Sequence, residues 1–223
     1  SSKVSHNVTK VMNNRVIIMI LTSILSFFGC KEKIESNKEK TEMDLLIEKS
    51  VNEYNNRKIY DKLTEEILIT IPDYNLEQTI LDNIDTNFEK GEQYSLDKIS
   101  KLTKGQQAVF STFWLEAEVY NGGFNQYYFN SSGKFSEIAE KGFKTIGSEK
   151  LSEIVGLANK TYLKNKAKLE EYDDGTIQSF SNSYDDNPLN DLDTEFIQNL
   201  ESTKFGDLRI RYIRENMNEF TIE

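Results

Sequence analysis

The chain has 223 residues and a formal net charge of −10, and it contains one histidine, His6, and one cysteine, Cys30. Beyond Cys30 there is neither residue type, which excludes histidine general bases, cysteine nucleophiles, structural zinc and disulfides from that part of the chain. The length suits one domain with a sizeable core. We therefore expect a single globular domain that is not an enzyme and needs no metal or other cofactor.

The segment from Met12 to Cys30 has the layout of a secretory signal peptide. Arg15 precedes an uncharged run, Val16 to Gly29. Such a run suits the roughly 7 to 15 residues of a signal core better than the about 20 residues of a membrane span. We expect residues 1–29 to be an upstream extension plus a signal peptide, the alternative being a short uncleaved membrane helix.

Gly29 followed by Cys30 resembles the end of a lipoprotein signal, where cleavage before the cysteine leaves that cysteine carrying lipid. The resemblance implies a lipid anchor at Cys30 and a body in the cell envelope, either facing the periplasm or at the cell surface. Residues 30–41 are rich in Lys, Glu, Ser and Asn, which is typical of a flexible tether. The folded domain is then expected over residues 42–223.

The first part of this domain contains two predicted helices and one segment of open type. Apolar residues recur every three or four positions from near Thr41 to about Tyr60, which predicts an amphipathic helix. Ile67–Ile71 is compatible with a short strand or with a helix, because its β-branched residues favour the strand and its spacing fits the helix. A helix around residues 76–88 is expected to end near Gly91.

A central helix is predicted from Lys104 to Tyr120. Thr103 and Gln106 form a capping-box signature at its start, and the helix is apolar nearly all round. Exposing large apolar side chains on two sides would cost about 1.5 to 3 kcal/mol each, so this helix should be buried among others. Further helices are expected near residues 135–146, 151–163 and 208–220. Residues 172–190 are expected to form an irregular crossing. The predicted fold class is all-α, a compact multi-helix single domain with a central buried helix.

The segment that follows the central helix, Asn121 to Gly133, is the most distinctive of the chain, and we call it the corner. We expect its two glycines to turn the chain through positive φ, its aromatic residues to pack into the core, and its Asn and Gln side chains to satisfy freed backbone groups. A phosphate loop is excluded, because the glycines follow a helix and no Lys-Ser/Thr pair follows them. The candidate residues of the corner are Asn121, Gly122, Gly123, Phe124, Gln126, Tyr127, Asn130 and Gly133.

Ten carboxylates and no Lys or Arg occupy residues 170–201. Such a stretch repels phosphates, so we expect no direct nucleic acid binding, and it attracts a basic protein partner. The alternative is a solvated face that keeps the protein soluble. The stretch lacks the ligand spacing of an EF-hand calcium loop. The candidate partner-binding acids are Asp173, Asp174, Asp185, Asp186, Asp191 and Asp193.

Three segments, "EVYNGGFNQYYFNSSG", "GFKTIGSEKLSEIVGLA" and "LDTEFIQ...LRIRYIRENMNEF", together resemble the DMP-type DNA-mimic protein domain family over about Asp97 to Phe220. The resemblance implies an all-α fold. It also implies a negatively charged surface that imitates DNA, since the best-known type of this family binds a transcription factor in that way. The phosphate mimics would be acids such as Asp173, Asp174, Asp185 and Asp186, whereas the corner carries no catalytic signature in that family.

The function expected from the sequence is an acidic binding module, a lipoprotein that engages a basic protein partner, either a DNA-binding protein or a toxin. An immunity-like inhibitor of a toxin is the alternative for a body facing the envelope. A carboxylate-based hydrolase would have to use Glu116 and Glu118, but two positions apart on a helix they point about 200° apart and cannot flank one bond. We expect Glu116 to contact the corner instead.

Overall fold

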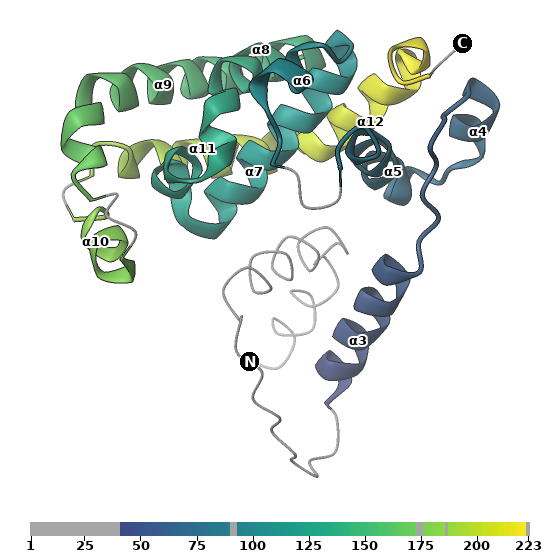
Figure 1. Ribbon diagram of the computed structural model, residues 1–223, viewed down its shortest axis with the longest axis horizontal. Coiled ribbons are helices and arrows are strands. Elements are labelled where there is room, and N and C mark those ends of the chain that lie inside the picture. The colour runs from purple at the N-terminus through teal and green to yellow at the C-terminus, as the bar shows by residue number, and fades with distance from the viewer. Residues whose placement is uncertain (1–40, 90–92, 173–175, 186, 222–223) are drawn as a thin grey trace. The chain divides into compact units, whose positions relative to one another are not determined.

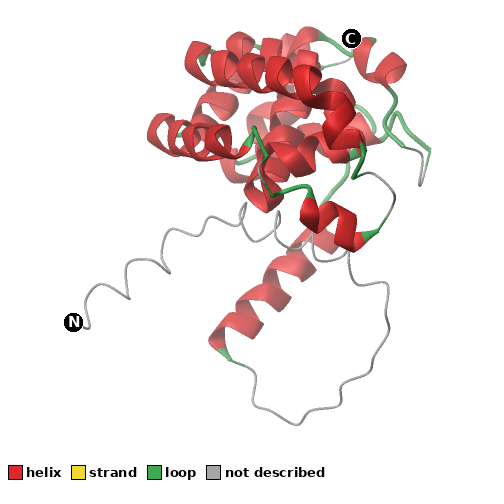
Figure 2. Cartoon of the chain, turned by 90° about the vertical axis from the view of Figure 1, so that its left-hand side faces the viewer, coloured by secondary structure: helices red, strands yellow, loops and turns green. Residues whose placement is uncertain are grey.

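The computed structural model describes residues 41–89, 93–172, 176–185 and 187–221, which form helices, turns and no strand (Figure 2). The predicted signal peptide, Cys30 and most of the predicted tether lie outside these residues. The chain divides into two units, residues 1–58 and 59–223. The helices are α3 (Glu42–Asn55), α4 (Glu65–Thr70), α5 (Asp73–Asp85), α6 (Leu96–Ser100), α7 (Lys104–Phe129), α8 (Ser136–Ile146), α9 (Glu149–Glu170), α10 (Ile177–Asn182), α11 (Asn190–Thr203) and α12 (Phe205–Glu215), with short 3-10 turns at Ser131–Phe135 and Met217–Glu219.

The first unit is described by α3, which starts with a capping box. The Thr41 hydroxyl accepts a hydrogen bond from the backbone N–H of Asp44, whose carboxylate accepts one from the N–H of Thr41. These contacts satisfy two N–H groups that the helix itself leaves free. The helix ends at Asn55, so its predicted extension to about Tyr60 was wrong.

The second unit begins with two helices, α4 and α5. The sequence left the type of the first open and predicted a later end for the second. Ile67–Ile71 is helical as far as Thr70, within α4, and Thr64 caps the start of that helix with its hydroxyl. Capping and helical spacing therefore outweighed the β-branched composition. The next helix, α5, ends at Asp85, earlier than the predicted end near Gly91, which is outside the described residues.

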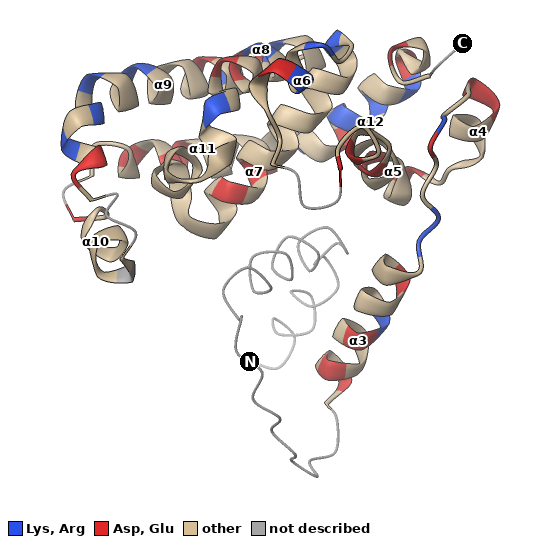
Figure 3. Ribbon diagram, viewed as in Figure 1, with Lys and Arg blue, Asp and Glu red and all other residues tan. Residues whose placement is uncertain are grey.

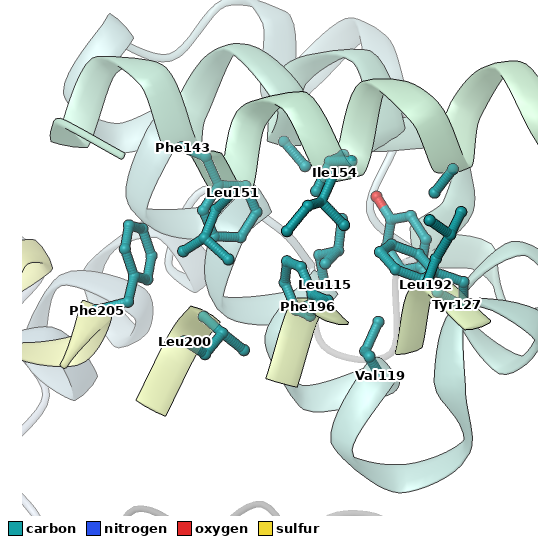
Figure 4. Close-up of a cluster of buried hydrophobic side chains, with 14 of the residues drawn as sticks. Leu115, Val119, Tyr127, Phe143, Leu151, Ile154, Leu192, Phe196, Leu200 and Phe205 are labelled. Atoms are coloured by element: carbon teal, nitrogen blue, oxygen red, sulfur yellow. The ribbon is translucent and has the colours of Figure 1, made fainter. Parts of the chain in front are cut away.

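The central helix α7 is buried as predicted and begins with the predicted capping box of Thr103 and Gln106. Its two apolar flanks belong to different hydrophobic clusters. Leu115 and Val119 lie in the cluster that α8, α9 and α11 complete (Figure 4), whereas Val109 and Phe110 lie in the cluster with α4 and α5. One helix thus serves two cores, because it is apolar on nearly all sides.

The layers around α7 follow from the order of the chain. α8 packs on α7, α9 folds back on α8, and α11 contacts both α7 and α9 (Figure 1). The turn between α8 and α9 uses Gly147 at φ 101°, a left-handed conformation that favours glycine at a helix end. Residues 172–190 were predicted to be irregular, but they contain the short helix α10.

Candidate functional site

The corner is a kink within α7. Helical geometry stops at Gly122 (φ −161°, ψ 30°) and Gly123 (φ 70°, ψ −178°) and resumes from Phe124 to Phe129. The predicted positive φ is therefore present at Gly123 and absent at Gly122, where extended backbone is open to any residue. At Gly122 the requirement is space, because an added Cβ would lie 2.3 Å from Oε1 of Gln126 and 2.7 Å from the hydroxyl of Tyr184.

The carboxylate of Asp193 fits against the kink from the first turn of α11. Its Oδ1 accepts a hydrogen bond of 2.7 Å from the backbone N–H of Phe124, a group that the break in the helix has left free. A Cβ on Gly123 would lie 2.2 Å from Asp193 Oδ2, so only glycine admits the carboxylate here. Burial raises the pKa of Asp193 to about 6, against the opposing effect of the Phe124 hydrogen bond.

A buried network of side-chain amides ties the segment before α11 to the same kink. The Asn125 amide donates to the Ser183 hydroxyl at 2.7 Å, and the Asn187 amide donates to Asn125 Oδ1 at 2.8 Å. The hydroxyl of Tyr184 donates to the carbonyl of Gly122 at 2.9 Å. The corner therefore holds Ser183, Tyr184, Asn187 and Asp193, four residues of the acidic stretch.

Glu118 receives the amide side chains of the corner. Its Oε2 accepts hydrogen bonds of 2.7 Å from both Gln126 and Asn130, and its Oε1 accepts one of 3.3 Å from Ser132. The expectation that Asn and Gln would satisfy backbone groups was therefore wrong for Gln126 and Asn130. Three donors on one carboxylate join the helix before the kink to the turn after it.

Glu116 does not reach the corner, contrary to our expectation. Its Oε2 accepts a hydrogen bond of 2.7 Å from the Arg209 guanidinium, which also pairs with Glu77 and lies fully buried between α5, α7 and α12. Sequence reasoning missed this ion cluster. A signal was present, since Arg209 lies four residues from both Phe205 and Ile213 and so on the apolar stripe of its helix.

The aromatic residues of the corner pack inward as predicted. Phe124 and Tyr127 are fully buried, and the ring of Tyr128 stacks on that of Tyr162 at 4.1 Å between centroids. The Tyr128 hydroxyl donates to Asn159 Oδ1 at 2.7 Å. The Tyr127 hydroxyl has no hydrogen-bond partner among the described residues, and burial raises its pKa well above the usual range.

Two other residues of the corner differ in their surroundings. Gly133 follows the resumed helix, and a Cβ there would lie 2.8 Å from the carbonyl oxygen of Tyr127, so close packing requires glycine. Asn121 is exposed, and no side-chain hydrogen bond joins it to the described residues. The expected backbone cap at Asn121 is therefore absent from this part of the chain.

The acidic stretch is more ordered, and more varied, than its composition suggested. Asp185 and Asp191 are exposed, Asp193 is half-buried at the kink, and Asp173, Asp174 and Asp186 lie outside the described residues. From Asn190 onward the stretch is helical, directly after the predicted crossing of residues 172–190. Two of its glutamates form ion pairs with lysines of α9, at 2.7 Å for Lys150–Glu195 and 3.4 Å for Lys166–Glu170.

A polar cleft of about 460 Å³ opens beside this stretch, between the C-terminal half of α9 and residues 187–191. Asn165 and Lys168 line one side of it, and Asn190 and Asp191 line the other. Within the described ranges, no group of three or more His, Cys, Asp or Glu is arranged to hold a metal ion. The described helices also include none that is long and apolar enough to cross a bilayer.

Comparison with known proteins tests the resemblance noted from the sequence. No curated protein and no solved structure matches the chain. The model of one protein family, described as DMP19-like protein, matches residues 100–216, which is just over half of the chain and includes the kink, the acidic stretch and α12. The chain therefore belongs to the family of DMP19-like proteins.

Proposed function

We propose that this protein is an acidic binding module that engages a basic protein partner and carries out no catalytic step. The observation that supports it best is the connection between the family motif and the acidic stretch. Asp193, Ser183 and Asn187 are all bonded to residues of the kink, which holds the backbone next to Asp185 and Asp191. A surface that is ordered before binding loses less conformational entropy when the partner arrives.

The contact surface would consist of the exposed acids that this scaffold presents. Asp185, Asp191 and Glu201 are exposed, and no Lys or Arg of the described residues pairs with them. Glu195, one turn after Asp191 on α11, already pairs with Lys150 and is not part of this surface. Exposed carboxylates without such a partner accelerate the approach of a cationic protein and make its binding sensitive to salt.

The partner's compartment depends on the lipid anchor, which we propose at Cys30. A lipidated protein would meet its partner in the envelope, and a cationic toxin is then the candidate, with this protein as its inhibitor. Feeding a labelled fatty acid to cells that express the chain, then locating the label by mass spectrometry, tests the anchor. An unlabelled product in the cytoplasm would instead direct the search to DNA-binding proteins, as family resemblance implies.

Binding is tested by capture of partners from envelope and cytoplasmic fractions with the wild-type chain and two variants. Asp185→Asn plus Asp191→Asn removes two exposed charges of the acidic stretch. Glu65→Gln plus Glu66→Gln removes two exposed charges of α4 and is the matched control. We expect the first pair to lose a salt-sensitive partner that the control retains. Retention of the same partner by both pairs at high salt would refute the proposal.

A further inference from the structure

The C-terminal half of α9 has a composition opposite to that of the rest of the chain. From Ile154 to Leu169 there are four lysines and no acid, in a protein of net charge −10. Lys160, Lys164 and Lys168 follow one another at four-residue intervals, so they lie along one side of the helix over about 12 Å. Figure 3 shows this half of α9 in blue and tan, with red only where the helix ends.

Two of these lysines are available to a partner. Lys166 pairs with Glu170 on the same helix, whereas Lys160 and Lys164 are exposed and form no ion pair with any carboxylate that the structure describes. Two leucines are exposed among them, Leu157 at 51% and Leu163 at 66%. We call the surface formed by Leu157, Lys160, Leu163, Lys164 and Lys168 the α9 face.

We propose that the α9 face docks on an anionic phospholipid surface. Exposed leucines next to lysines suit this partner, because the apolar side chains enter the boundary between headgroups and acyl chains while the ammonium groups stay at the phosphates. Nucleic acid fits the face less well, since its phosphates would use the lysines and leave both leucines in water. An acidic protein could also bury the leucines, so binding to poly-glutamate is measured beside binding to vesicles.

The net negative charge of the protein does not cancel this attraction. Charges in solution are screened over about 8 Å at physiological ionic strength, so a membrane senses mainly the groups that face it. Along α9 the nearest acid toward the amino end is Glu153, seven residues or about 10 Å before Lys160. The half-buried Glu140 of α8 also lies beside this end of the face, where its carboxylate accepts a hydrogen bond of 2.9 Å from Asn159. Glu170, beyond the other end, is already paired with Lys166.

A lipid anchor at Cys30 would strengthen binding of the α9 face to a membrane, but the face is tested independently of the anchor. An anchored protein is held next to the bilayer at a high effective concentration, at which weak contacts become occupied. The full chain is therefore mixed with vesicles of phosphatidylcholine alone and with vesicles that contain phosphatidylglycerol in equal part. Because the apolar run before Cys30 is the same in every variant, differences between variants report on the α9 face alone.

The decisive variant is Lys160→Gln plus Lys164→Gln, compared with Lys62→Gln plus Lys104→Gln, which removes two exposed lysines elsewhere. Each lysine near an anionic surface contributes about 1 kcal/mol, so the first pair should lower partitioning onto phosphatidylglycerol vesicles roughly thirtyfold. The control pair should lower it far less. Leu157→Ser plus Leu163→Ser should weaken binding without changing its dependence on salt.

Two results would overturn the proposal. One is equal retention of wild type and the Lys160→Gln, Lys164→Gln variant on phosphatidylglycerol vesicles. The other is loss of poly-glutamate or single-stranded DNA binding in that variant with vesicle binding unchanged, which would assign the α9 face to an acidic polymer. Thermal unfolding of each variant establishes that the fold is intact. Neither result depends on the fatty-acid label at Cys30, which tests the anchor separately.

Discussion

Asp193 Oδ1 lies 2.7 Å from the backbone nitrogen of Phe124, 69 residues earlier in the chain. This hydrogen bond joins the first turn of α11 to the break in α7 and replaces a bond that a continuous helix would have formed within itself. Gly123 makes it possible, because any side chain there would occupy the place of the carboxylate. The family motif therefore holds the first turn of α11, which belongs to the acidic stretch.

The stability of the protein should depend on pH through Asp193. Burial raises the pKa of this carboxyl to about 6, above the 3.8 that is normal for Asp, so the native state binds the proton more tightly than the unfolded state does. The free energy of unfolding should therefore fall as pH rises from about 4 to 6, and stay level above it. Because the group is partly solvated, we expect a change of about 1 kcal/mol. Urea unfolding of Asp193→Asn, which cannot titrate, should lack this slope, and an unchanged slope would show that other groups cause it.

Gly123→Ala should destabilise the protein in two separable ways. The φ and ψ of Gly123 belong to a region open to little but glycine, which costs of order 1–3 kcal/mol for another residue, and the new Cβ would collide with Asp193. Gly147→Ala is the control for backbone strain alone, since Gly147 also has positive φ but open space around it. Thermal unfolding should give a larger loss at Gly123. Adding Asp193→Ala should produce less than the sum of the two single losses, and full additivity would argue against the collision.

Of the corner's asparagines, Asn125 should contribute to stability and Asn121 should not. Asn125→Ala breaks hydrogen bonds to Ser183 and Asn187 in a buried site, and we expect a loss of about 1–3 kcal/mol. Asn121→Ala removes an exposed side chain that the described residues do not hold, so the change should stay within about 0.5 kcal/mol. Chemical denaturation measures both. A large loss at Asn121 would restore the backbone cap expected from its sequence.

Removal of the buried guanidinium should be among the most damaging single changes. Arg209→Met leaves the carboxylates of Glu77 and Glu116 without their cation, which costs about 3–5 kcal/mol. Arg214→Met is the control, because Arg214 is only partly buried and pairs with an exposed Asp73. Its loss also frees the carbonyls of Leu68 and Ile71 but leaves no buried charge, so it should cost less. Circular dichroism during heating compares the two. Replacing Glu77 and Glu116 by leucine in the Arg209→Met background should restore much of the loss, since no buried charge then remains unpaired.

Much of the fold could be predicted from local patterns along the chain. The capping box of Thr103 and Gln106 marks where α7 begins, and its nearly continuous apolar surface indicates burial among other helices. The family was indicated by the corner together with the segments after it, and the family match over residues 100–216 confirms it. Helix ends were less certain, as Asn55 and Asp85 show, because they depend on which of several weak local preferences the surrounding contacts favour.

The sequence by itself thus determined the all-α class, the buried central helix, the family and the acidic stretch of residues 170–201, because each depends on composition or on a pattern of nearby residues. Only the tertiary structure decided the partners of Asp193, Glu118 and Arg209. These pairings join residues up to 132 positions apart, and a carboxylate or guanidinium in a sequence carries no mark of its distant partner. Burial between packed helices selects the partner, because a charge removed from water must find one.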